Sequence, residues 1–140
     1  MNIALFAYGT LQNPQVMFQV TGRFFSSIPV RLEGYACYSL KGRSFPGIRK
    51  EPDKITQGLL YSEIGPATLA KLDLFEDDFY VRSTVEVIAE TGERIAAEAY
   101  VIAEQHYALL DETPWDLERF TAHGLKGFLK DRHIFSNNSA

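Results

Sequence analysis

Cysteine is almost absent from this sequence. The 140 residues include one cysteine, Cys37, so no disulfide can form within the chain and no paired-cysteine metal knuckle exists. This usage fits a reducing compartment, and we expect the protein to be cytoplasmic. Cys37 lies in an apparent strand beside Tyr35 and Tyr38, which favours a buried, unreactive thiol over a nucleophile.

Long apolar runs and metal-binding spacings are also missing. The first seven residues lack basic side chains and are too short for a signal segment, and no stretch is long enough to span a bilayer. The three histidines, His106, His123 and His133, form no HxxxH or HxxE unit. Nucleotide-binding glycine patterns and a GxSxG elbow are absent too. We therefore expect no membrane segment, no metal and no cofactor.

A basic face is missing as well. The net charge is −4, and the fourteen Lys and Arg residues are scattered. The densest basic group is Arg43, Arg49, Lys50 and Lys54, which we interpret as a solvated loop. Nucleic acid is therefore not an expected partner.

What the sequence does contain is typical of one small globular domain. Hydrophobic residues make up 46% of the chain and aromatic residues 13%, which indicates a core or a pocket rich in rings. We expect a single domain over residues 1–135 and a frayed tail over residues 136–140. The composition makes no prediction of oligomeric state.

Strands and helices are mixed along the chain. Predicted strands share apolar runs or apolar alternation and cover residues 3–8, 28–40 with a bulge at Gly34, 58–64, 81–89 and 95–102. Predicted helices follow Asn13-Pro14, Gly65-Pro66 and Thr113-Pro114, with Asn13 and Thr113 as N-caps. A loop is expected at residues 45–48, a surface turn at 51–53 and a hairpin turn at Thr91-Gly92. This irregular order predicts an α+β fold.

Four residues at the end of the first strand form one candidate site: Tyr8, Gly9, Thr10 and Leu11. One interpretation is a simple strand-to-helix turn in which Gly9 permits an unusual backbone angle. Another is an anion cradle, since free backbone N–H groups beside a helix start can hold a carboxylate or an oxyanion. The four residues alone favour the turn.

A second candidate is the acidic end of the predicted helix at residues 66–76. Glu76, Asp77 and Asp78 follow one another where the helix dipole disfavours negative charge. The run is interpreted either as a solvated loop or as a local conflict that marks a functional site.

Taken together, the short motifs resemble the gamma-glutamylcyclotransferase-like family, in the branch of the plant avirulence-induced-gene proteins. The resemblance extends over residues 4–128. It is carried by the order Tyr8-Gly9-Thr10-Leu11, Gly34-Tyr35, Phe45-Pro46-Gly47, Gly58, Leu72-Asp73-x-Phe75-Glu76, Tyr80-x-Arg82, Tyr100 and Trp115.

The resemblance implies a fold, a reaction and a set of site residues. The fold would be a small mixed β-barrel or curled sheet with peripheral helices. The reaction would release 5-oxoproline from a small gamma-glutamyl substrate without a cofactor. Glu76 would be the catalytic acid and base, and residues 8–11 would bind the gamma-glutamyl part. Tyr80 and Arg82 would lie near the pocket, although Arg82 is equally interpreted as the ion-pair partner of a nearby acid.

One position departs from the family pattern. Asp77 stands where the family usually has a glycine, so its side chain adds charge beside Glu76. Two alternatives therefore stay open. The first is a non-catalytic protein that binds or senses a small molecule in the same pocket, and the second is a related enzyme that acts on another amide or acyl group.

Overall fold

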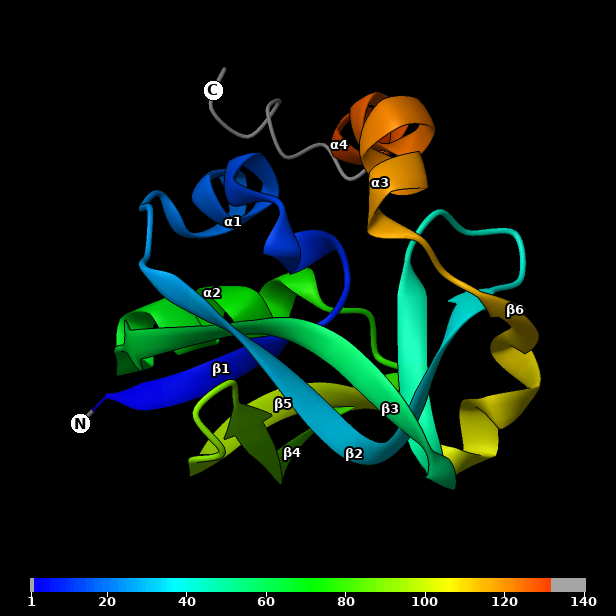
Figure 1. The fold of residues 1–140 in the computed structure, drawn as a ribbon. Coiled ribbons are helices and arrows are strands. Elements are labelled where there is room, and N and C mark those ends of the chain that lie inside the picture. The colour runs from blue at the N-terminus through cyan, green and yellow to red at the C-terminus, as the bar shows by residue number, and fades with distance from the viewer. Residues whose placement is uncertain (1, 132–140) are drawn as a thin grey trace.

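The protein is an α+β barrel with helices around it, seen in a computed structural model that describes residues 2–131 (Figure 1). The strands are β1 (Ile3–Ala7), β2 (Ser27–Leu40), β3 (Pro46–Ile64), β4 (Tyr80–Ala89), β5 (Arg94–Ile102) and β6 (Leu110–Pro114). The helices are α1 (Pro14–Thr21), α2 (Pro66–Phe75), α3 (Leu117–Arg119) and α4 (Leu125–Asp131). Short helical turns are η1 (Thr10–Gln12), η2 (Glu104–Leu109) and the π-helical η3 (Phe120–Gly124).

The sheet closes on itself. The strand order is β3-β1-β5-β4-β2-β6, and β2 pairs again with β3, so five strands form a closed barrel and β6 extends it. β1 and β5 pair in parallel, and the other neighbours are antiparallel. This confirms the expected α+β class and the mixed barrel.

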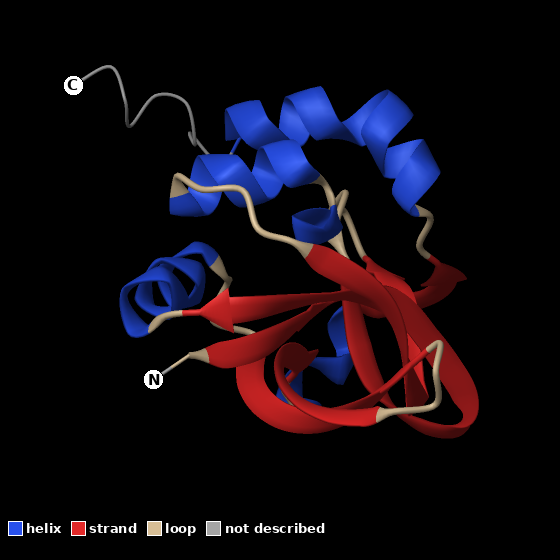
Figure 2. Cartoon of the chain, turned by 60° about the vertical axis from the view of Figure 1, so that its left-hand side comes forward, coloured by secondary structure: helices blue, strands red, loops and turns tan. Residues whose placement is uncertain are grey.

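Strand β1 is buried on both faces, which explains its continuous apolar run. Phe6 and Tyr8 contribute to the core inside the barrel, whereas Leu5 and Ala7 contribute to a second core that includes residues of the surrounding helices. The helices lie mostly on one side of the strands in Figure 2. The end of β1 therefore reaches the boundary between the barrel and its helices.

Several local predictions are confirmed. The Asn13 side chain caps α1 by accepting hydrogen bonds from the N–H groups of Gln15 and Val16. α2 begins at Pro66 as expected, and β4 and β5 form the predicted hairpin. Gly34 has a φ of 83° at a register shift between β2 and β3, which is the predicted bulge.

Other local predictions are wrong, because long-range pairing overrides local turn signals. Residues 46–48 are not a loop, since they pair with β2. Residues 51–53 do not end a strand but lie at the bulge within β3. The helix near Trp115 is capped by Asp116 rather than Thr113, since Leu110 and Pro114 pair with β2 as strand β6.

Basic residues 43–54 are not simply a solvated loop. Arg49 lies in β3, pairs with Glu51 and Glu112 at 3.3 Å, and stacks over the Tyr38 ring. Arg43 covers the Phe79 ring.

The expected tail at residues 136–140 lies outside the described residues. None of the helices in residues 2–131 has both the length and the hydropathy needed to cross a membrane.

Candidate active site

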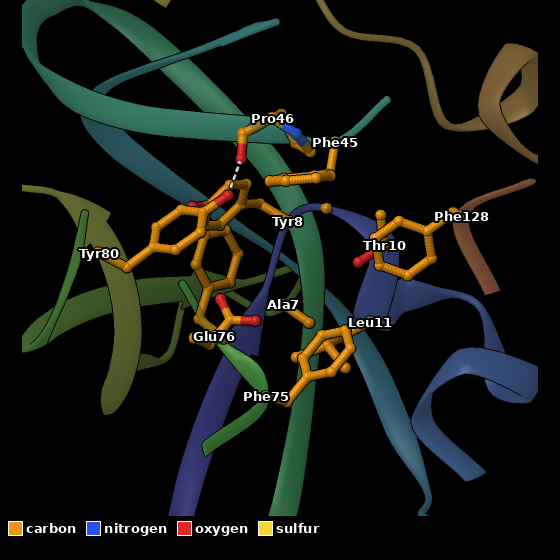
Figure 3. A pocket seen from close by; sticks show the side chains of 12 residues that line it. Ala7, Tyr8, Thr10, Leu11, Phe45, Pro46, Phe75, Glu76, Tyr80 and Phe128 are labelled. Carbon is orange, nitrogen blue, oxygen red and sulfur yellow. Dashed lines mark hydrogen bonds between the residues drawn. The ribbon is translucent and has the colours of Figure 1, made fainter. Parts of the chain in front are cut away.

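A hollow lies where the end of β1, the start of β3 and the end of α2 meet (Figure 3). It encloses about 410 Å³ measured out to its open mouth, of which only about 30 Å³ is wide enough for water-sized groups. Its lining residues come from strands, loops and helices, and they are Phe6, Ala7, Tyr8, Gly9, Thr10, Leu11, Phe45, Pro46, Phe75, Glu76, Tyr80 and Phe128. All four residues of the first sequence candidate are therefore brought together with Glu76 and Tyr80.

Side-chain hydrogen bonds to backbone carbonyls fix the loop at residues 8–11. The Gln12 side-chain amide donates to the carbonyls of Tyr8 at 2.7 Å and Gly9 at 3.2 Å. The Tyr61 hydroxyl donates to the Leu11 carbonyl at 2.6 Å. In a trans peptide the N–H points opposite to the carbonyl, so the N–H groups of Gly9 and Thr10 point away from Gln12. Gln12 does not line the hollow, whereas Gly9 and Thr10 do.

The space around Gly9 favours glycine at this position. Its φ is −118°, but a Cβ atom would lie 3.0 Å from the Pro46 ring. The close approach of this loop to the first residue of β3 narrows the hollow and fixes one of its walls.

Tyr8 presents a buried phenol at the base of the site. Its hydroxyl donates to the Tyr100 carbonyl at 2.5 Å. Burial raises the pKa of Tyr8 well above its ordinary value, and the nearby Tyr80, Cys37 and Glu76 groups raise it further. Tyr8 therefore stays protonated at neutral pH and serves as a fixed hydrogen-bonding group.

Glu76 stands at the C-terminal cap of α2, where its N–H donates to the Leu72 carbonyl at 3.1 Å. Its half-buried carboxylate extends into the hollow toward Tyr8 and Ala7 in Figure 3. Its charge is among the causes that raise the pKa of both Tyr8 and Tyr100. The helix dipole disfavours the acidic run at this helix end, and one acid of that run, Glu76, lies in the hollow.

Tyr80 and Arg82 differ in where they lie. Tyr80 lines the hollow, and its hydroxyl donates to the Pro46 carbonyl at 2.5 Å. Arg82 does not line it but pairs with Asp73 at 3.0 Å and with Glu98 at 2.9 Å. The ion-pair interpretation of Arg82 therefore describes what its side chain does in this structure.

The sequence predicted a core or a pocket rich in rings, but it did not assign Phe128 to the site or identify the support beneath the loop at residues 8–11. Phe45, Phe75 and Phe128 line the hollow, and their rings pack edge to face with Phe128 between the other two, at 5.7 and 6.0 Å. Phe128 arrives from α4, far along the chain, and no local signal could have placed it here. Among residues 2–131, no three His, Cys, Asp or Glu side chains gather as metal ligands would.

Comparisons with known proteins identify the family of this chain. Residues 5–117 match the family described as "Gamma-glutamyl cyclotransferase, AIG2-like". The chain belongs to this family. It is 33% identical to AIG2-like protein C of Arabidopsis thaliana over 135 residues, which cover 96% of this chain and 78% of that protein.

Solved structures share the fold. The solution structure of an Arabidopsis thaliana protein matches with a TM-score of 0.73 and 26% identity, covering 99% of this chain and 85% of that one. A structure named gamma-glutamyl cyclotransferase matches with a TM-score of 0.63 and 18% identity, covering 74% and 68% of the two chains. The second likeness concerns the fold alone. Within this family, the hollow at Glu76 is the candidate active site of the present chain.

Proposed function

We propose that this chain is a gamma-glutamylcyclotransferase that cleaves a small gamma-glutamyl compound into 5-oxoproline and a free amine, with Glu76 as general acid and base. The observation that carries the proposal is the meeting of Glu76 with residues 8–11 in one hollow. Family membership supports the reaction class.

The substrate brings its own nucleophile. Its α-nitrogen forms a bond to the γ-carbon, the bond from the γ-carbon to the leaving nitrogen breaks, and a five-membered lactam results. Two protons leave the α-ammonium group and two reach the leaving nitrogen, which departs as an ammonium ion. No water is consumed. Holding the bound substrate with its α-nitrogen against the γ-carbon can lower the activation barrier by about 7–11 kcal/mol.

Glu76 is the group proposed to move these protons. Its carboxylate takes a proton from the α-nitrogen and returns one to the leaving nitrogen, in turn. Such proton transfer contributes on the order of 10²–10⁴-fold to the rate. Tyr8 is buried and its pKa is raised, so its phenol stays neutral near the Glu76 carboxylate.

Residues 8–11 are proposed to bind the gamma-glutamyl part. The N–H groups of Gly9 and Thr10 point away from Gln12, so they are suited to hold the substrate carboxylate or the developing oxyanion. Thr10, Leu11 and Tyr80 also line the hollow and are proposed to contact the substrate. Arg82 is proposed to act indirectly. It forms an ion pair with Asp73 on α2, the helix whose C-cap is Glu76.

The enclosed part of the hollow is narrow. About 30 Å³ holds one or two water-sized groups, which is less than a glutamyl side chain. Substrate must therefore occupy the open mouth, or the rings of Phe45, Phe75 and Phe128 must turn aside when it enters.

The substitution Glu76→Gln tests the proposal. This variant should fold normally, bind gamma-glutamyl compounds and lose about 10²-fold or more in 5-oxoproline release. The matched control is Asp78→Asn, which removes one charge from the exposed neighbouring position and should keep full activity. Full activity of Glu76→Gln would refute the assignment.

A second candidate is a non-catalytic protein that binds the same compounds. Asp77 favours it, because a half-buried acid replaces the usual glycine immediately after Glu76. Calorimetry with a set of gamma-glutamyl compounds, combined with mass spectrometry of the products, separates the two candidates. Tight binding without 5-oxoproline supports the binding protein, whereas another released product supports a related acyl or amide transferase.

A further inference from the structure

The side chain of Gln12 holds two consecutive backbone carbonyls of the loop at residues 8–11. Its Nε2 atom donates to the Tyr8 carbonyl at 2.7 Å and to the Gly9 carbonyl at 3.2 Å. A carbonyl oxygen only accepts hydrogen bonds, so the nitrogen of this amide, and not its oxygen, must face the loop. One neutral side chain therefore directs its N–H donors at two neighbouring peptide groups.

These side-chain hydrogen bonds are additional to those that form the turn. In η1 the backbone N–H of Gln12 donates to the Gly9 carbonyl at 3.1 Å, and the N–H of Asn13 donates to the Thr10 carbonyl at 3.0 Å. The turn therefore has backbone hydrogen bonds of its own. Formation of the turn does not by itself account for an amide side chain at residue 12.

Close packing does not account for this amide either. The Gln12 side chain is half-buried and lines two cavities, of about 330 Å³ and about 90 Å³, but it does not line the hollow at Glu76. Space remains beside the side chain, so its two hydrogen bonds hold it against the loop. Gln12 therefore contacts the loop without contacting a substrate in the hollow.

Each of the two carbonyls belongs to a peptide group whose N–H lies on the opposite side. The Tyr8 carbonyl and the Gly9 N–H share one planar group, and the Gly9 carbonyl and the Thr10 N–H share the next. A donor at the carbonyl oxygen draws electron density from the amide nitrogen, which makes the N–H a stronger donor. This cooperative gain is about 10–30% per hydrogen bond. Gln12 therefore acts on both of the N–H groups that are proposed to hold the substrate.

We propose that Gln12 is a positioning residue, which orients the N–H groups of Gly9 and Thr10 toward the hollow and strengthens them as donors to the negative charge of the substrate. It acts through the peptide groups and does not touch the substrate itself. This inference rests on the proposed function, since the substrate and the reaction are the ones named there.

The substitution Gln12→Met tests this role in turnover. Methionine has nearly the length of glutamine but carries no N–H, so both side-chain hydrogen bonds are lost and the backbone bonds of η1 remain. Removing one oxyanion donor outright costs about 10²–10³-fold in rate, so weakening two donors should lower kcat/KM for 5-oxoproline release by about tenfold. An unchanged kcat/KM would overturn the inference.

The matched control is Gln57→Met. Gln57 lines the larger of the two cavities together with Gln12, and its exposed side chain makes no hydrogen bond within residues 2–131. This variant loses an amide from the same cavity but leaves the loop contacts intact, so its kcat/KM should equal that of the unaltered chain. A loss as large as that of Gln12→Met would mean that the cavity, and not the two carbonyl contacts, is responsible, which would also overturn the inference.

Nuclear magnetic resonance separates this role from a purely structural one. Without a donor at its oxygen, a peptide group is less polarised, so its carbonyl ¹³C and amide ¹⁵N resonances move upfield. The ¹³C resonances of the Tyr8 and Gly9 carbonyls and the ¹⁵N resonances of Gly9 and Thr10 should shift in Gln12→Met and stay in place in Gln57→Met. A lower kcat/KM with these four resonances unchanged would reduce Gln12 to a structural role and overturn the inference.

These resonances also keep the inference separate from the proposed function, because they are measured without substrate. If the unaltered chain releases no 5-oxoproline from any gamma-glutamyl compound, the proposed reaction fails, and calorimetry with gamma-glutamyl-alanine then tests Gln12. Upfield shifts together with several-fold weaker binding by Gln12→Met support the positioning role. Equal affinities of the variant and the unaltered chain, or no binding by either, overturn it.

Discussion

The Tyr100 hydroxyl donates a hydrogen bond of 2.7 Å to Asp73 Oδ1, although the two residues lie 27 positions apart. Asp73 belongs to α2, the helix that ends at Glu76. The Tyr100 carbonyl accepts the Tyr8 hydroxyl at the same time. One residue of β5 therefore holds both the first loop of the candidate site and the helix that presents its acid.

Replacing Tyr100 by phenylalanine should separate these two tasks. The ring and the carbonyl remain, so Tyr8 keeps its partner, but the hydroxyl bond to Asp73 is lost. We expect a loss of about 1 kcal/mol in the free energy of unfolding, since Asp73 is partly exposed. We also expect turnover to fall about three- to tenfold as Glu76 loses its fixed position. Urea unfolding and kcat measure the two effects, and an unchanged kcat would restrict Tyr100 to a structural role.

Arg82→Gln should act on stability more than on substrate binding. Arg82 pairs with Asp73 and Glu98, and its side chain is 34% exposed, so solvent weakens both pairs. We expect the free energy of unfolding to fall by about 0.5–1 kcal/mol and KM to change by less than about twofold. A rise in KM of an order of magnitude would instead mean that Arg82 contacts the substrate, as the family resemblance implied.

Alkaline pH should weaken the fold through its buried tyrosines. Burial raises the pKa of Tyr61 to about 12, whereas an unfolded tyrosine titrates near 10. The neutral phenol is favoured in the folded state, so its contribution is complete below about pH 10 and is lost as the pH rises toward 12. Tyr61→Phe should show a shallower loss of stability across this window in urea titrations. If the free energy of unfolding fell equally steeply with pH in both proteins, the raised pKa of Tyr61 would be contradicted.

Cys37 should react slowly with alkylating reagents. Burial raises the pKa of its thiol to about 12, so almost no thiolate is present at pH 8. Iodoacetamide should modify the folded protein at least about tenfold more slowly than the protein in urea. Cys37→Ala should retain 5-oxoproline release. Rapid modification of Cys37 that abolishes activity would mean that the thiol has a functional role.

Gly58→Ala should destabilise the barrel. A Cβ atom at this position would collide with the Ala7 carbonyl and would lie 2.7 Å from Phe6 Cε1. Overpacking of this kind costs about 1–3 kcal/mol, and here backbone is among the atoms that must move. Gly127→Ala is the contrasting variant, because nothing lies within 4 Å and the residue is in helix α4. It should gain about 0.5–1 kcal/mol of helix propensity. Thermal unfolding of both variants measures the difference.

Local chemistry predicted much of this fold. The Asn13 cap, the start of α2 and the bulge at Gly34 all follow from residues that act on their immediate neighbours. The loop at residues 8–11 and Glu76 were recognised as a set only through the order of family motifs, and the structure brings them into one hollow.

The remaining features depend on pairing between distant segments. Residues 51–53 contain a strong turn signal, yet β3 continues through them because β2 lies alongside on both sides of the bulge. Strand β6 has little apolar alternation, and its pairing with β2 alone defines it. Arg43 was indistinguishable from its basic neighbours in sequence, and only the structure shows that its guanidinium lies over the Phe79 ring.

The parallel pairing of β1 with β5 sets an order in which the molecule can be assembled. β1 is made first, but its neighbours β3 and β5 follow only after residues 46 and 94. A nascent chain shorter than about a hundred residues therefore has no closed barrel, and Tyr8 has no Tyr100 to contact. During synthesis β1 must therefore wait for the β4–β5 hairpin, so a truncated product that ends before β5 carries the loop at residues 8–11 but cannot close the barrel beneath the candidate site.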